Sequence, residues 1–220
     1  MKNNIFVTKT RKQIQQLDDL PTYDRSLINY SKYNKSVGHA GVKYSMAVQA
    51  TRGCPYRCFY CDVYKTTLHH YRRSVDSIYE EVKMIADMGV KRIEFIDDIF
   101  NVKAKDFVEF FNRAIKGNLG VSFFFPTALK GDLLNKEVID VMMQGGAVGV
   151  NVSLESASPR MQKVMRKNLD IEKFRENLEY ICKNYPEAVT TLNTMHGFPT
   201  ERSEEHTSEL QSLVNLVCRL

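Results

Sequence analysis

Hydrophobic positions along the middle of the chain follow two alternating patterns. Short apolar runs of six or seven residues are followed by longer stretches in which apolar residues return every three or four positions. In the stretch 74–89, for example, Ile78, Val82 and Ile85 recur at helical spacing, and Gly89 is a suitable helix end. The short runs therefore predict β-strands, and the periodic stretches predict amphipathic α-helices.

Together these patterns predict five strands separated by helices. The predicted strands are 46–51, 91–97, 121–126, 148–154 and 189–195. The predicted helices are 74–89, 103–117, 135–146, and one broken or two successive helices in 158–167 and 171–185. This alternation is typical of βαβ units that build a parallel sheet with helices packed outside. The periodicity does not distinguish an open sheet from a barrel, but no G-x-G-x-x-G follows the first strand, which argues against a dinucleotide-binding fold.

Composition narrows the class of protein. The chain has 220 residues, 43% of them hydrophobic and 26% charged, which suits one globular core. No apolar run is long enough to span a membrane, and the first residues do not resemble a secretory signal. The net charge of +5 is a mild excess that a solvated surface explains, so nucleic-acid binding is not expected. The cytoplasm is the expected compartment, because the cysteines are clustered rather than arranged as a disulfide framework.

The most distinctive motif directly follows the first predicted strand. The sequence CPYRCFYC places Cys54, Cys58 and Cys61 within eight positions. Three thiolates at this spacing can hold a four-iron cluster and leave one iron open to another ligand. The alternative is a structural zinc site completed by His69 or His70, although the usual paired Cys-x2-Cys is absent. The corresponding functional alternative is a non-catalytic metal-binding or electron-transfer module.

This motif resembles the C-x3-C-x-φ-C signature of the radical S-adenosylmethionine superfamily, with Tyr60 as the aromatic residue φ. The resemblance covers roughly residues 15–201. It implies an α/β fold, a partial (β/α)6 TIM-like barrel, in which the three cysteines hold a 4Fe–4S cluster and the open iron binds S-adenosylmethionine. An electron passed through the cluster then cleaves this cofactor to methionine and a 5′-deoxyadenosyl radical, which abstracts hydrogen from a small-molecule or peptide substrate. A flavodoxin- or ferredoxin-type protein is the implied electron donor.

Within the superfamily, the segment 72–100 and three shorter segments are similar to a branch that is often fused to a cobalamin-binding domain. The three shorter segments are LDDLPTYDRSLINYSKY, SLESAS and MHGFPTE. Cobalamin-dependent methyl transfer is therefore the leading reaction subclass. The Asp-x-His-x-x-Gly motif that carries cobalamin's lower ligand is absent from the sequence. Either cobalamin is not used, or its domain belongs to another part of the protein or to a separate chain.

The resemblance also implies contacts with S-adenosylmethionine, while it assigns no catalytic residue. The implied cofactor-binding residues are Tyr60, Asp97, Asp98, Ser153, Glu155, Ser156 and Gly197. The two aspartates match residues that contact the methionyl amino group, but one of them can instead cap the turn before the next helix. The fourth-strand residues match contacts to the ribose and methionyl portion, although Glu155 can instead form a buried ion pair. Arg166 and Lys167 can pair with the cofactor carboxylate or simply be solvated.

The last nineteen residues do not continue the strand–helix alternation. The segment RSEEHTSELQS, residues 202–212, resembles a translated sequencing-library adapter. The sequence thus predicts an irregular lead-in over 1–45, a barrel core over 46–201 that is incomplete after the fifth strand, and a non-native tail over 202–220. The alternative for the tail is a natural amphipathic helix.

Overall fold

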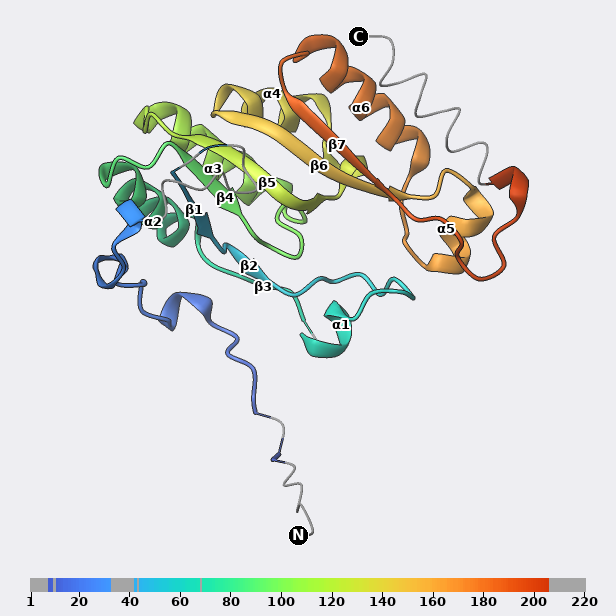
Figure 1. Ribbon diagram of the computed structural model, residues 1–220, viewed down its shortest axis with the longest axis horizontal. Coiled ribbons are helices and arrows are strands. Elements are labelled where there is room, and N and C mark those ends of the chain that lie inside the picture. The colour runs from blue at the N-terminus through green and yellow to red at the C-terminus, as the bar shows by residue number, and fades with distance from the viewer. Residues whose placement is uncertain (1–7, 10, 33–41, 43, 68, 206–220) are drawn as a thin grey trace.

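The computed structural model describes residues 8–9, 11–32, 42, 44–67 and 69–205. Its main element is a five-stranded sheet in which all neighbouring strands run parallel (Figure 1). In spatial order the strands are β1 (Ser45–Val48), β4 (Arg92–Phe95), β5 (Ser122–Leu129), β6 (Ala147–Glu155) and β7 (Val189–Thr194). The spatial order follows the chain order, as in a barrel built from successive βα units. The predicted parallel α/β sheet is confirmed.

Helices connect the strands of this sheet. They are α2 (Val75–Asp87), α3 (Ala104–Gly117), α4 (Lys136–Gln144), α5 (Pro159–Met165) and α6 (Ile171–Asn184). Helices α2, α3, α4 and α6 lie along one side of the sheet, and the short helix α1 (Val63–Thr66) lies away from them (Figure 1). The predicted helices are confirmed, with ends that shift by at most two residues. None of the described helices combines the length and apolar character needed to cross a membrane.

Aromatic side chains fill much of the core between the sheet and its helices. The ring of Phe95 on β4 lies 4.6 Å from that of Phe100 and 5.3 Å from that of Phe110 on α3, measured between centroids. Seven phenylalanines are at most 1% exposed: Phe95, Phe100, Phe107, Phe110, Phe111, Phe123 and Phe125. Because such a close-packed interior resists deformation, it holds the strands and helices in a fixed arrangement.

The first predicted strand, 46–51, is wrong in its second half. β1 ends at Val48, and the next two residues with strand geometry form β2 (Thr51–Arg52), which pairs antiparallel with β3 (Tyr71–Arg72). The carboxylate of Asp97 holds the chain where it leaves the sheet, since its Oδ1 atom accepts hydrogen bonds from the backbone N–H groups of Ala50 and Thr51. The β2–β3 hairpin therefore brackets the cysteine loop.

The described part of the lead-in packs against the core. It contains three 3-10 turns, Leu17–Asp19, Arg25–Leu27 and Tyr30–Lys32, and a fourth such turn, Gly131–Leu133, follows β5. Leu17 is only 4% exposed. The lead-in is thus part of the folded unit.

Candidate functional site

The three clustered cysteines lie on the irregular loop between β2 and α1, beside the carboxyl ends of the parallel strands. Each is half-buried and carries a free thiol. Burial is the main cause that raises the pKa of the Cys54 thiol to about 11, and negative charge on Cys58 and Cys61 acts in the same direction. Burial also raises the pKa of the Cys58 thiol, while the positive charge of Lys167 opposes this rise. A cationic ligand would therefore bind by displacing protons from these thiols.

The donor chemistry of this loop fits an iron–sulfur cluster, because the loop offers three free cysteine thiols within eight positions. In the part of the chain that the structure describes, no three His, Cys, Asp or Glu side chains are gathered as metal ligands. The sulfurs must therefore move together when a cluster binds. Residues 53–62 contain neither helix nor strand that would oppose this movement.

The histidines of the zinc alternative do not complete a ligand set with the cysteines. His70 Nε2 lies 3.3 Å from the carbonyl oxygen of Ile99, and burial lowers the pKa of its imidazole. The His69 ring packs edge-on against Tyr71, with centroids 6.0 Å apart. Both histidines thus have contacts outside the cysteine loop, although they line the same cleft as Cys54.

The two predicted aspartates anchor the base of the loop, with different accessibility. Asp97 is 2% exposed, and its Oδ1 atom accepts hydrogen bonds from Ala50 N at 3.0 Å and Thr51 Oγ1 at 2.6 Å. Its Oδ2 atom is buried without a hydrogen-bond partner, and burial raises the pKa of its carboxyl to about 6. Asp98 is exposed, and its Oδ2 atom accepts a hydrogen bond from Gly53 N at 2.8 Å. Of the two, only Asp98 is accessible to a ligand.

Neither aspartate caps α3, the helix that follows. The N-cap of α3 is Lys103, which makes no side-chain capping bond. The aspartates bond instead to backbone N–H groups at both ends of β2.

An ion pair connects the end of β6 to the cysteine loop. Lys167 Nζ lies 3.1 Å from Glu155 Oε1 and 3.3 Å from the Tyr60 hydroxyl oxygen. Burial, followed by the charge of Glu155, raises the pKa of the Tyr60 phenol. The backbone N–H of Phe59 also donates to the carbonyl oxygen of Met165 at 2.8 Å. The loop is therefore fixed on this side by residues that are distant in sequence.

Glu155 adopts an uncommon backbone conformation at this point. Its φ is +65°, in the left-handed region that non-glycine residues rarely enter. The residue lies at an irregularity in the pairing of β6 with β7. Such strain is typical of positions where a side chain is held for function.

The remaining predicted cofactor contacts differ in exposure. Ser153 Oγ is half-buried and accepts a hydrogen bond from Asn193 Nδ2 on β7 at 3.2 Å. Ser156 is fully buried, and its hydroxyl oxygen accepts from the N–H of Ser158 at 3.2 Å. A cofactor could reach Ser156 only after its surroundings move. Gly197 has a φ of +74°, and no atom lies within 4 Å of where a Cβ would stand, so the space beside its Cα is open.

Phe198 is a residue of the site that the sequence reasoning missed. Its ring lies edge-on to Phe59 and Tyr60, at centroid distances of 6.4 Å and 6.3 Å. Glu201 Oε2 accepts hydrogen bonds from the backbone N–H groups of Gly197 at 2.6 Å and Phe198 at 3.0 Å. The loop after β7 therefore contacts the cysteine loop. In the sequence, the aromatic residue in GFPTE was the feature that could have indicated this contact.

The described start of the predicted tail, residues 202–205, contacts α5. Glu205 Oε1 accepts hydrogen bonds from Ser158 Oγ at 2.7 Å and Arg160 Nε at 2.8 Å. These bonds lower the pKa of the Glu205 carboxyl to about 2, with Arg160 the largest cause. Arg160 is thus engaged by Glu205, whereas Lys163 and Arg166 are exposed. The rest of the tail, 206–220, lies outside the described residues.

This fold and site define a parallel α/β barrel protein with a three-cysteine loop at the strand ends. The family model of the Radical SAM superfamily matches residues 48–210. The chain belongs to this superfamily, which confirms the family implied by CPYRCFYC.

Curated relatives carry methyl or methylthio transfer in their names. An uncharacterized methyltransferase of Pyrococcus horikoshii is 28% identical over 200 residues, which cover 89% of this chain and 41% of the relative. A tRNA-2-methylthio-N(6)-dimethylallyladenosine synthase of Aquifex aeolicus is 26% identical, over 90% of this chain and 46% of the relative. The chain thus spans less than half the length of these two relatives.

A solved structure supports the fold. The radical S-adenosylmethionine methyltransferase TsrM of Kitasatospora setae, with cobalamin and a 4Fe–4S cluster bound, superimposes with a TM-score of 0.71 at 17% identity. The match covers 86% of this chain and 36% of that one. The likeness shows the fold, a partial barrel of the radical S-adenosylmethionine type, as the sequence resemblance implied.

Proposed function

We propose that this chain is the radical-generating core of an S-adenosylmethionine-dependent enzyme that transfers a methyl-type group. The observation that carries the proposal is the loop of three free thiols at the strand ends. Its base is held by Asp98 and its far side by the Lys167–Glu155 pair. The membership of the chain in the superfamily and the names of its relatives support the same conclusion.

Cys54, Cys58 and Cys61 would hold the 4Fe–4S cluster. When bound, the cluster supplies the electron that cleaves S-adenosylmethionine. Asp98 is accessible beside the loop, and a carboxylate there would accept hydrogen bonds from the methionyl ammonium group. The ammonium group of Lys167 would attract the methionyl carboxylate, at the expense of part of its interaction with Glu155.

Cobalamin is the second cofactor to test, because the TsrM structure contains it. The lower-ligand motif Asp-x-His-x-x-Gly is absent from this sequence. We therefore propose methyl-type transfer as the reaction class without assigning a cobalamin ligand to this chain. The assay is run with and without added cobalamin, and a methylated product that forms only with it supports the cobalamin-dependent subclass.

Anaerobic reconstitution with iron and sulfide tests the proposal. About four irons per chain and a broad visible absorbance are expected, followed by formation of methionine and 5′-deoxyadenosine when dithionite and S-adenosylmethionine are added. Cys58→Ala should abolish both. Cys182→Ala is the matched control, because Cys182 is a free thiol on α6 outside the loop.

The rival function is a non-catalytic metal-binding module. Tight binding of one zinc with no retained iron would establish the rival, and so would a bound cluster that never cleaves S-adenosylmethionine. Retained cleavage in Cys58→Ala would overturn the ligand assignment.

The electron donor is also a proposal, and the structure offers a surface for it. Cys54 lines an open cleft together with Pro55, Arg57, Tyr64, Lys65, His69 and His70. None of these residues is acidic, although Asp62 pairs with Lys65 at its edge. This cleft suits an acidic donor of the flavodoxin or ferredoxin type, in the cytoplasm where thiols stay reduced. Arg57→Glu should weaken reduction by flavodoxin and leave reduction by dithionite unchanged.

A further inference from the structure

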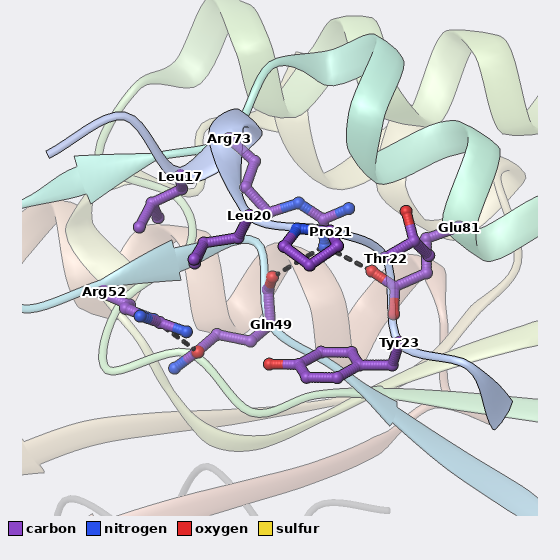
Figure 2. A pocket seen from close by; sticks show the side chains of 9 residues that line it. All are labelled: Leu17, Leu20, Pro21, Thr22, Tyr23, Gln49, Arg52, Arg73 and Glu81. Atoms are coloured by element: carbon purple, nitrogen blue, oxygen red, sulfur yellow. Dashed lines mark hydrogen bonds and ion pairs between the residues drawn. The ribbon is translucent and has the colours of Figure 1, made fainter. Parts of the chain in front are cut away.

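Glu81 is a buried acidic residue that the proposed chemistry does not use. It lies on α2, is 3% exposed, and pairs with two arginines, Arg25 and Arg73, of which Figure 2 shows Arg73. Arg25 Nη2 lies 2.6 Å from Glu81 Oε1, and Arg73 Nη1 contacts Glu81 Oε2. A carboxylate this deeply buried requires such partners. The two partners come from segments that are 48 residues apart in the sequence.

Arg73 connects this carboxylate to the residues that precede the cysteine loop. Its backbone N–H donates to the carbonyl oxygen of Ala50 at 3.0 Å, and its Nη1 atom donates to that of Gln49 at 3.1 Å. Gln49 Oε1 in turn accepts a hydrogen bond from Arg52 Nε at 3.1 Å. Arg52 is two residues before Cys54, so this network reaches the start of the loop.

Arg25 connects the same carboxylate to the lead-in. Its Nη2 atom also donates to the carbonyl oxygen of Ala47 on β1 at 3.0 Å. Earlier in the lead-in, both carboxylate oxygens of Asp18 accept from the backbone N–H of Ser74, the N-cap residue of α2, at 3.0 Å. Residues 17–25 are therefore attached to β1 at Ala47, to the N-cap of α2 at Ser74, and to Glu81 further along α2.

A small cavity separates these attachment points. Residues of the lead-in form one wall, and Gln49, Arg52 and Arg73 form another, with Glu81 at one end (Figure 2). The lead-in residues that line it are Leu17, Leu20, Pro21, Thr22 and Tyr23. The lead-in thus faces the residues that support the cysteine loop, and not merely the outside of α2.

We propose that residues 17–25 are a clasp that positions the cysteine loop, and that Arg25 is its positioning residue. Arg25 holds the lead-in on Glu81, and Glu81 holds Arg73 against Gln49 and Ala50. If the clasp is released, Arg73 keeps its partner but the wall that restrains residues 49–52 is lost. The bonds that Asp97 and Asp98 make to Ala50, Thr51 and Gly53 should then open more often.

Arg25→Met is the informative substitution. It removes the guanidinium group but keeps an unbranched apolar stem at position 25, and it leaves Glu81 and Arg73 as a neutral pair. Amide hydrogen exchange is measured on the metal-free full chain. The expected result is at least tenfold faster exchange at Ala50, Thr51 and Gly53, with no change in β5. Arg25→Lys keeps a charge for Glu81 and should restore most of the protection.

Arg113→Met is the matched control. Arg113 also pairs with α2, through Asp76, but it lies on α3 and its side chain is 36% exposed. Its removal should leave exchange at Ala50 and Gly53 unchanged. If Arg25→Met speeds exchange only within residues 17–27, the lead-in is merely docked and the proposal is wrong. If Arg25→Met does not yield folded protein, exchange in Arg25→Lys is compared with exchange in the wild type. A smaller acceleration is then expected at Ala50, Thr51 and Gly53, and unchanged exchange at all three would overturn the proposal.

The exchange measurement does not depend on the proposed function, because no cluster is present. The link to the cluster rests on that function and is tested separately, as the rate at which a chelator removes iron from reconstituted protein. Faster loss in Arg25→Met than in Arg113→Met supports a role in cluster retention. If Arg25→Met alters exchange but loses iron at the same rate as Arg113→Met, the clasp acts only on the metal-free loop. That result would overturn its role in cluster retention. Failure of both proteins to bind iron would overturn the proposed function and leave the exchange result standing.

Discussion

The ammonium group of Lys167 lies 3.1 Å from the carboxylate of Glu155, and their side chains are only 13% and 11% exposed. The pair joins the end of β6 to the chain just after α5, and Lys167 also reaches the hydroxyl of Tyr60 in the cysteine loop. Two buried charges of opposite sign therefore fix the position of the loop relative to the sheet.

Lys167→Met should destabilise the fold, because it leaves Glu155 buried without its counter-ion. The expected loss is about 3 kcal/mol in the free energy of unfolding. Urea denaturation of the metal-free protein measures it. Lys163→Met is the control on the preceding helix α5, since Lys163 is exposed, and it should change stability by less than about 0.5 kcal/mol. An equal effect of both substitutions would contradict the role of the pair.

Asp97 predicts a distinctive dependence of stability on pH. Burial raises the pKa of its carboxyl from 3.8 to about 6. The folded state therefore binds the proton more tightly than the unfolded state, and stability is lost as pH rises from about 4 to about 6. By linkage the difference amounts to about 3 kcal/mol.

Asp97→Asn keeps an acceptor oxygen for Ala50 and Thr51 but removes the titration. The wild type should thus lose stability relative to Asp97→Asn between pH 4 and pH 6, and the difference should stay constant above that range. Urea denaturation at several pH values checks this. Parallel curves for the two proteins would show that Asp97 does not titrate in this way.

Much of the fold could be predicted from the sequence because periodicity reports directly which face of an element is buried. The spacing of Ile78, Val82 and Ile85 predicts α2, and all three are fully buried. The end of β1 was missed because a distant residue determines it. Nothing near Val48 in the sequence indicates that Asp97 will bond to the backbone at Ala50.

The candidate site shows the same limit. The three cysteines were identified from local spacing, whereas Lys167 looked like one of several solvated cations. Its role depends on the turn after α5, where Arg166 and Asn168 on either side of it both have φ above +50°. Phe198 was missed for a similar reason, since its contacts with Tyr60 exist only when β7 lies beside β6.

Glu201 should act on the loop after β7 through the backbone. Its Oε2 atom accepts from the N–H groups of Gly197 and Phe198. Glu201→Ala removes both acceptor interactions, each worth about 1 kcal/mol, so hydrogen exchange at these two amides should become roughly tenfold faster. Glu201→Gln retains a carbonyl oxygen and should preserve most of the protection. Equal acceleration in both variants would point to the charge rather than to the hydrogen bonds.

Gly53, next to Cys54, should be intolerant of any side chain. Its φ is +81°, and an added Cβ would stand 2.6 Å from Thr67 Cγ2 and even closer to the carbonyl oxygen of His69. Gly53→Ala combines the cost of a left-handed backbone, about 1 kcal/mol, with a clash that the β2–β3 hairpin can relieve only by moving. We expect a loss of more than about 2 kcal/mol in stability and weaker iron retention after reconstitution.

Gly89→Ala separates these two causes. Gly89 has a nearly identical φ of +80°, but no atom lies within 4 Å of where its Cβ would stand. This variant should show only the backbone cost of about 1 kcal/mol and should retain iron like the wild type. Because both glycines carry the same conformational penalty, the difference between the two variants measures the steric contact at the hairpin. If Gly53→Ala retains iron as well as Gly89→Ala does, the close approach of Gly53 to His69 is not what shapes the cysteine loop.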